Sequence, residues 1–196
     1  TWKSRKLLFE RLGSKMERST AVSRFKPLVA ISACLLGEAV RYDGGAKPNQ
    51  WIIEELGQRV DFLPLCPEAS AGLGVPRPPV RLNHTATGVR ALGVDDPALD
   101  ATNPILRWSR DFLGRIPPVS ACILKARSPS CGYLSAPLFD PAGNQLDTVS
   151  GLFAAALGER LPQLLIVNEE MLVSDAGKEK FLRDLRAASL NLPAPG

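Results

Sequence analysis

Three of the four cysteines in this chain stand where a hydrophobic run gives way to turn-forming residues. Cys34 follows the run 28–33, and Cys66 follows the run 60–65. Cys131 lies in a Ser-Pro-Ser-Cys-Gly turn, a few residues beyond a third such run. Because ligands bind an open parallel sheet at the carboxyl ends of its strands, residues far apart in sequence converge there. Three thiols at one edge of a sheet indicate a metal or cluster site.

The spacing of these cysteines does not by itself identify the metal, since it matches no Cys-x-x-Cys zinc pattern. A [4Fe-4S] cluster normally takes four cysteines, so three would leave one iron open to act as a Lewis acid. A zinc site with three cysteines would need a fourth donor, for which His84 is the only histidine in the chain. Cys122, at an alternating position inside the third run, is interpreted as a core residue.

Polar residues that suit catalysis accompany the three cysteines. Loops after strand ends are where α/β enzymes keep acids, bases and anion-binding groups. A carboxylate beside a cluster can activate water, and a serine hydroxyl can hold a polar substrate. Any one of these charged residues, taken alone, is most simply interpreted as a solvated side chain. Their common position beside the three cysteines favours a catalytic or binding role. The loop residues of these kinds are Arg41, Tyr42, Asp43, Glu68, Lys125, Arg127, Ser128 and Ser130.

Alternating strand and helix patterns predict the scaffold that holds these loops. Each strand is a short apolar run, and each helix carries cap or stop residues such as Gly57, Pro104 and Ser174. We expect an open, mostly parallel α/β sheet with helices on both faces, a Rossmann-like three-layer fold in a single domain. The predicted strands are 28–33, 60–65, 119–124 and 163–167, and the predicted helices are 50–56, 103–113, 150–161 and 174–190.

Three segments between these elements carry weaker patterns. The Pro/Gly-rich stretch 66–79 is interpreted as a shaped loop that excludes a helix or a central strand. Residues 80–95 alternate around a turn and predict a small β-hairpin. Thr102 or Asn103 is the expected N-cap of the helix that follows, and 139–143 reads as a turn.

Composition and charge describe an ordinary globular domain with a basic arm. The chain has 196 residues, 45% of them hydrophobic, enough for one core. Of the net charge of +4, residues 1–27 contribute +6, which leaves 28–196 slightly acidic. Residues 1–27 are predicted to form a basic amphipathic arm that packs on the domain or a partner, with an RNA or membrane surface as the alternative.

The number of cysteines also indicates the cellular compartment of the protein. Four in this length is too sparse for a disulfide scaffold, and no export signal is evident, so reduced thiols in a cytoplasmic protein are expected. No apolar stretch approaches the roughly 20 residues that a transmembrane helix needs.

Three ordered motifs make the chain recognisable. They resemble a bacterial family long catalogued only as a domain of unknown function, whose members include thiouracil desulfurases (TudS). The resemblance covers about residues 28–170 and leaves out the arm and the last helix. The motifs are Ser32-Ala-Cys-Leu-Leu-Gly37 with Arg41-Tyr-Asp-Gly44, Cys66-Pro-Glu68 with Pro76-Arg-Pro-Pro79, and Ser128-Pro-Ser-Cys-Gly132.

The resemblance implies a [4Fe-4S] cluster held by Cys34, Cys66 and Cys131. The open iron would bind the sulfur of a thiolated pyrimidine or a related thioamide, which leaves as hydrosulfide while water supplies oxygen. Glu68 would then be the acid/base, and Ser120 or Ser130 would position the substrate. Competing hypotheses are a metal or Fe-S module that handles sulfur without turnover, and an RNA-associated factor that uses the arm.

Two positions depart from the family pattern. Val40 stands where many relatives carry a further cysteine, and Arg81 stands where relatives commonly have an acidic residue. A cation in place of a carboxylate at the pocket rim would change which substrate is accepted. We therefore expect the family's chemistry to be retained more firmly than its substrate.

Overall fold

Four parallel strands form the sheet that carries the cysteines. The computed structural model describes residues 26–190, so the predicted arm lies almost wholly outside the described residues. The strands read as continuous apolar runs because both faces of the sheet are covered. Sheet A has the order β2-β1-β5-β8, with β1 (Leu28–Ser32), β2 (Asp61–Leu65), β5 (Ala121–Leu124) and β8 (Leu165–Asn168).

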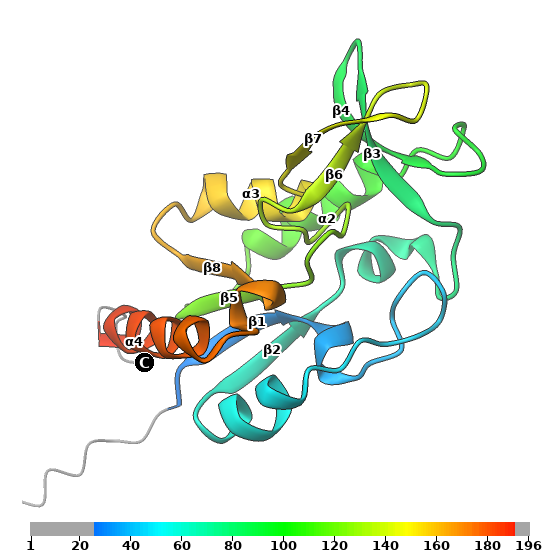
Figure 1. The fold of residues 1–196 in the computed structure, drawn as a ribbon. Helices are drawn as coiled ribbons and strands as arrows, with labels where there is room; N and C mark the ends of the chain where they lie inside the picture. The colour runs from blue at the N-terminus through cyan, green and yellow to red at the C-terminus, as the bar shows by residue number, and fades with distance from the viewer. Residues whose placement is uncertain (1–25, 191–196) are drawn as a thin grey trace, which may run out of the picture.

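Helices cover both faces of sheet A, which confirms the three-layer prediction (Figure 1). On one face, Val29 and Ile31 pack against Phe181 in a core formed with the segments η2 (Trp51–Glu55), η3 (Leu56–Gln58), η5 (Glu169–Leu172) and α4 (Asp175–Leu190). On the other face, Cys122 and Leu124 pack against Phe153 in a core formed with α2 (Thr102–Leu113) and α3 (Leu152–Arg160). No helix within residues 26–190 is long and apolar enough to cross a membrane.

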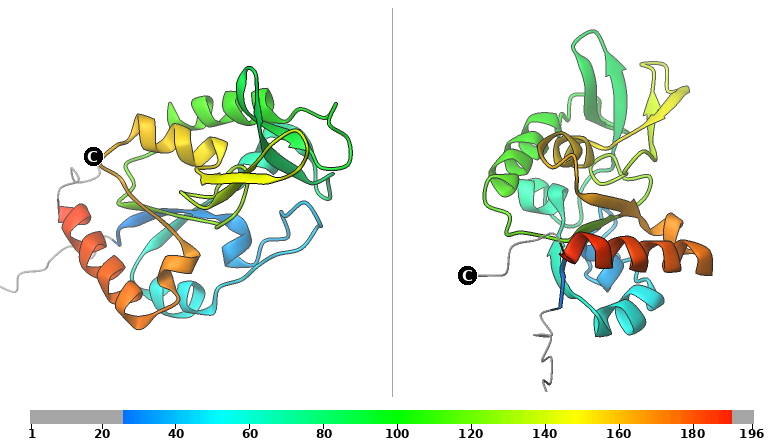
Figure 2. Two further views of the ribbon diagram at one scale, coloured as in Figure 1. Left: turned by 45° about the horizontal axis from the view of Figure 1, so that its top comes forward. Right: turned by 90° about the vertical axis from the view of Figure 1, so that its left-hand side faces the viewer.

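A second four-stranded sheet lies beyond the ends of α2 and α3 (Figure 2). Its order is β4-β3-β6-β7, and only the β3–β6 pair is parallel. The β3–β4 hairpin is the one predicted at 80–95, whereas β6 and β7 were not predicted. The exposed β7 lacks an apolar face to signal a strand. The strands are β3 (Val80–Thr85), β4 (Gly88–Gly93), β6 (Ala136–Phe139) and β7 (Gln145–Val149).

The stretch 66–79 differs from the prediction, since it begins with helical turns rather than a loop. The turns start at Pro67 and continue through η4 (Ala69–Leu73). Proline is tolerated in the first turn of a helix, because its missing N–H has no partner there. The helical geometry is interrupted at Gly72, whose φ of 87° is accessible to glycine. Only the second half of the stretch is loop.

The start of α2 also corrects the prediction. Thr102 is the first helical residue, and its N–H donates to Oδ1 of Asp100 at 2.9 Å. The Thr102 hydroxyl instead accepts a buried hydrogen bond from Ala91 N–H at 2.9 Å, which fixes α2 on β4. The N-cap position is Ala101, and the side chain of the preceding Asp100, rather than Thr102 or Asn103, accepts from the first N–H of the helix. The cap predicted at Ser174 is confirmed, since its Oγ accepts from Gly177 N–H at 3.1 Å.

Candidate functional site

The loops that follow β1, β2 and β5 enclose one cavity at the carboxyl edge of sheet A. Its volume is about 580 Å³, and Cys34, Cys66 and Cys131 all line it. Three short apolar strands thus bring together three thiols that lie up to 97 positions apart in sequence. This is the edge at which open parallel sheets bind ligands.

Cys34 is held by a tight turn directly after β1. The turn η1 (Ala33–Leu36) ends at Gly37, whose φ of 95° suits glycine. The carbonyl of Cys34 accepts from Gly37 N–H at 3.3 Å and from Lys47 N–H at 2.9 Å. The backbone around the first thiol is therefore fixed on both sides of the loop.

Cys131 is held by a loop that rests on the start of α3. The Ser128 hydroxyl accepts from the N–H groups of Ser130 at 3.2 Å and Cys131 at 3.0 Å. The first N–H groups of a helix have no partner within the helix. Here Leu152 N–H donates to Pro129 O at 2.9 Å, and Phe153 and Ala154 N–H donate to Ser130 O at 3.0 and 3.1 Å. The helix start thereby anchors the third cysteine loop.

Gly151 permits this close approach, and its substitution should loosen the loop. A Cβ at Gly151 would lie 2.6 Å from the carbonyl carbon and oxygen of Ser130. We expect Gly151→Ala to lower the free energy of unfolding by about 1–3 kcal/mol, the usual cost of overpacking. Chemical denaturation measures the change. Gly158→Ala, on the same helix with nothing within 4 Å of its Cβ, should stabilise by about 0.5–1 kcal/mol. Equal effects at the two glycines would contradict the steric argument.

Burial keeps all three thiols protonated near neutral pH in the metal-free protein. It raises the pKa of Cys34 to about 11, with a further rise from the charge of Cys66 and opposition from Lys125 and Arg41. Burial also raises the pKa of Cys66. It raises the pKa of Cys131 well above the ordinary value, against a hydrogen bond from Ser32. Reactive nucleophilic cysteines have lowered pKa values, so these thiols are poor nucleophiles in the metal-free protein, and a metal that binds them must displace their protons.

Glu68 lines the cavity beside the thiols and is tied at both carboxylate oxygens. Oε2 accepts from Nε of Arg77 at 3.0 Å and lies 3.0 Å from its Nη2. Oε1 accepts from the Ser130 hydroxyl at 2.9 Å. Ser130 is fully buried and lies behind the cavity wall, so it contacts Glu68 rather than lining the cavity. Its place in the structure is that of a residue that holds Glu68.

Two other candidates lie away from the cavity. Ser120 precedes β5, at the opposite end from the thiols, and its N–H donates to Leu28 O at 2.8 Å. It does not line the cavity. His84 is exposed on β3 in the second sheet and does not line the cavity either. The structure therefore provides no histidine as the fourth ligand of a zinc site with three cysteines.

The two departures from the family pattern fall in different places. Val40 lines the cavity, and its carbonyl accepts from the Cys66 thiol at 3.6 Å. Arg81 lies on β3, with its guanidinium 5.0 Å from the centre of the Phe139 ring, and it does not line the cavity. The change at position 40 therefore alters the cavity wall, whereas the cation at position 81 lies beyond it.

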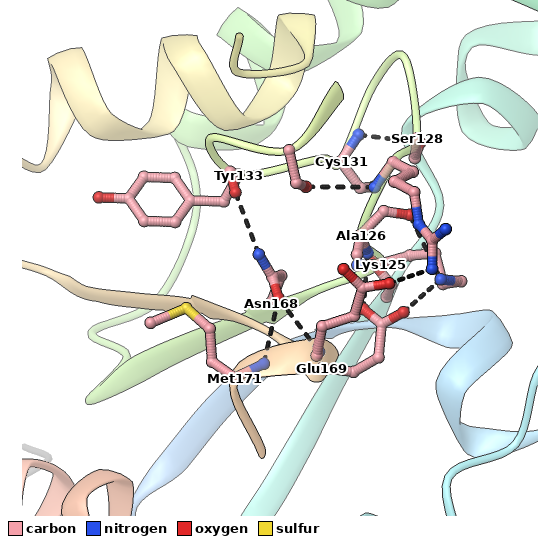
Figure 3. Close-up of polar contacts among 12 residues, drawn as sticks. Lys125, Ala126, Ser128, Cys131, Tyr133, Asn168, Glu169 and Met171 are labelled. Atoms are coloured by element: carbon pink, nitrogen blue, oxygen red, sulfur yellow. Dashed lines mark hydrogen bonds and ion pairs between the residues drawn. The ribbon is translucent and has the colours of Figure 1, made fainter. Parts of the chain in front are cut away.

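The structure adds a brace from β8 that the sequence did not indicate (Figure 3). The Glu169 carboxylate pairs with Lys125 and accepts from Ala126 N–H at 2.6 Å. The side-chain N–H of Asn168 donates to Tyr133 O at 3.2 Å. Asn168 and Glu169 stand where β8 ends. Like the cysteine loops, they therefore lie at the carboxyl edge of the parallel sheet, where ligands bind. The brace fixes the chain on both sides of Cys131.

Ser32 is a second residue missed from the sequence. It ends β1 and lines the cavity. Its hydroxyl accepts from Lys125 N–H at 2.9 Å, and its interaction with Cys131 lowers the pKa of that thiol against the effect of burial. Its place one residue before the end of the first predicted strand was the available signal.

The donor set fits a cluster better than a single ion. Within residues 26–190, no three His, Cys, Asp or Glu side chains are close enough to hold one metal ion. Three ligands of one zinc would each lie about 2.3 Å from it. In a [4Fe-4S] cluster each cysteine binds a different iron, so the three sulfurs stand further apart around a shared cavity. Cys34, Cys66 and Cys131 line one cavity without forming a group close enough for a single ion, which is compatible with a cluster.

A parallel α/β sheet with three thiols and a carboxylate at its carboxyl edge defines a candidate cluster-dependent α/β enzyme. A model of the 2-thiouracil desulfurase family matches residues 29–170. The solved structure of the [4Fe-4S]-dependent thiouracil desulfidase TudS is 29% identical, with a TM-score of 0.61 over 80% of this chain and 99% of that chain. Among curated proteins, none matches the sequence. The chain belongs to the 2-thiouracil desulfurase family.

Proposed function

We propose that this protein is a [4Fe-4S]-dependent desulfurase that removes sulfur from a thiolated pyrimidine such as 2-thiouracil. The observation that carries the proposal is the cavity itself, in which three cysteine thiols from three strand ends surround a space beside a carboxylate. The family match and the name of the TudS relative supply the reaction class and the cofactor.

Cys34, Cys66 and Cys131 would hold the cluster. When bound, the cluster supplies an iron without a protein ligand, which acts as a Lewis acid toward the sulfur of the substrate. Replacing a C=S bond by C=O consumes one water and releases hydrosulfide, with no net change of oxidation state. The protein must therefore position a planar base, admit one water and move protons, and needs no electron donor.

Glu68 is the proposed acid/base. Its Oε2 is occupied by Arg77, whereas Oε1 accepts only the Ser130 hydroxyl among the contacts described and keeps a second lone pair for a proton. Oε1 is therefore the atom proposed to take a proton from the attacking water and return it to the leaving sulfur. Ser130 positions this oxygen.

The remaining cavity wall suits a planar heterocycle. Tyr42 lines the opening with 43% of its surface exposed, which leaves an aromatic side chain accessible to a base. Apolar side chains on the inner wall exclude bulk water from the reacting bond. These residues are Val40, Leu65, Pro67, Pro79, Val80 and Pro129.

Anaerobic reconstitution with iron and sulfide tests the proposal. The protein should bind about four irons per chain and absorb broadly near about 400 nm. With 2-thiouracil it should then release sulfide and form uracil in equal amounts, measured by sulfide assay and chromatography. Iron uptake without sulfide release from any thiolated base would support the non-catalytic alternative. Stoichiometric zinc with no iron uptake would contradict the cluster.

A further inference from the structure

Arg77 makes more contacts around the cavity than any role in charge balance requires. Its side chain is only 4% exposed and forms an ion pair with Glu68. Its Nη1 donates to two carbonyl groups, Val40 O and Gly74 O, each at 3.0 Å. Its backbone N–H donates to Tyr42 O at 2.8 Å. A single residue thus uses its guanidinium and its backbone on four different partners.

These partners belong to two of the three cysteine loops, and one of them contacts the third. Val40 and Tyr42 lie in the loop that follows Cys34, and Glu68 lies two residues after Cys66. The third loop is reached through Glu68, because Ser130, directly before Cys131, donates to its other oxygen at 2.9 Å. The Cys66 thiol donates to the same Val40 carbonyl that accepts from Arg77. The contacts form one network that joins the three loops.

A buried ion pair is weak evidence for stability, because desolvation of both charges offsets their attraction. The planar guanidinium fork explains the pair better, since it fixes the directions of several hydrogen bonds at once. Lysine has one nitrogen on a flexible stem and cannot reach Glu68 and both carbonyl groups in this geometry. Geometry, rather than charge, is what Arg77 adds.

We propose that Arg77 is a positioning residue that sets the mutual spacing of the Cys34, Cys66 and Cys131 loops, and that this spacing retains the cluster. The proposal rests on the proposed function only in that a cluster is bound. The proposal assigns the Pro-Arg-Pro-Pro segment a role in positioning the cysteine loops, although none of its residues would be a ligand of the cluster. It also explains how loops on three separate strands keep one arrangement.

The test compares Arg77→Lys with Arg90→Lys. Arg90 also pairs with a carboxylate, donating through Nε to Asp100 Oδ2 at 2.8 Å, but it lies in the second sheet and does not line the cavity. Both reconstituted proteins are treated anaerobically with an iron chelator, and the loss of cluster absorbance is followed. Circular dichroism confirms that each variant is folded.

We expect Arg77→Lys to lose its cluster at least ~10-fold faster than the unchanged protein, the scale of one lost hydrogen bond to a charged group. Arg90→Lys should lose it at the unchanged rate. Added guanidinium ion should slow the loss in Arg77→Ala and leave Arg90→Ala unaffected. Unchanged retention in Arg77→Lys, or equal losses in the two lysine variants, would overturn the proposal.

Ser130→Ala keeps the test decisive if Arg77→Lys does not fold, because it removes only the link to the third loop. It should also shorten the lifetime of the cluster, and full retention would overturn the proposal. The measurements distinguish a failure of the proposed function from a failure of the positioning role of Arg77. If the unchanged protein takes up no cluster, the proposed function fails. If it binds a cluster that the Arg77 and Ser130 variants retain equally well, only the positioning role fails.

Discussion

Each of the substitutions Cys34→Ser, Cys66→Ser and Cys131→Ser should abolish iron uptake and sulfide release. Each cysteine comes from a different strand end, so no neighbouring thiol of the same loop can replace it. A serine hydroxyl is a poor substitute for a soft thiolate ligand of an iron–sulfur cluster. Iron analysis, absorbance after anaerobic reconstitution and a sulfide assay measure the loss. We expect values at background for all three variants.

Cys122→Ser provides the matched control. Cys122 is fully buried in β5 and packs in the core on the α2 and α3 side of sheet A. Its substitution should lower stability by about 1–3 kcal/mol, because a hydroxyl is left in an apolar core. The folded variant should bind the same amount of iron as the unchanged protein. A full cluster in any of the three other variants, or none in folded Cys122→Ser, would contradict the assignment of ligands.

The sequence predicts sheet A well because each of its strands is a short apolar run between strong turn or cap signals. It predicts half of the second sheet, since β3 and β4 alternate in polarity around a turn. β7 escapes prediction because its side chains are exposed, and β6 because only Leu138 and Phe139 of its four residues are large and apolar. The helical turn after Cys66 escapes prediction because proline was taken to exclude a helix where the first turn tolerates it.

The candidate site could be predicted only as far as strand ends locate it. Cys34, Cys66 and Cys131 follow strand ends, and the cavity joins them. Arg77 could not be assigned a role, because its contacts with Val40 and Glu68 depend on how separate loops fold back on one another. Ser120 was proposed from the family resemblance, but its position before the strand places it at the end opposite the cavity.

Glu68→Gln should retain the cluster and lose at least ~100-fold in turnover, the usual scale for a lost general acid/base. Glutamine has nearly the same shape, so its amide oxygen can still accept from Arg77 and its amide nitrogen can donate to the Ser130 hydroxyl. It cannot take a proton from water near neutral pH. The expected change is therefore in kcat, measured per cluster bound by sulfide release under anaerobic conditions.

The substitution also leaves the buried Arg77 without an opposite charge, which lowers stability and must be separated from catalysis. Iron content and turnover are therefore compared well below the Tm of the variant. Glu38→Gln makes the same chemical change at an exposed position near the cavity, and it should leave kcat unchanged. Loss of the cluster in Glu68→Gln would make Glu68 structural. Near-full turnover with an intact cluster would place the acid/base on another residue.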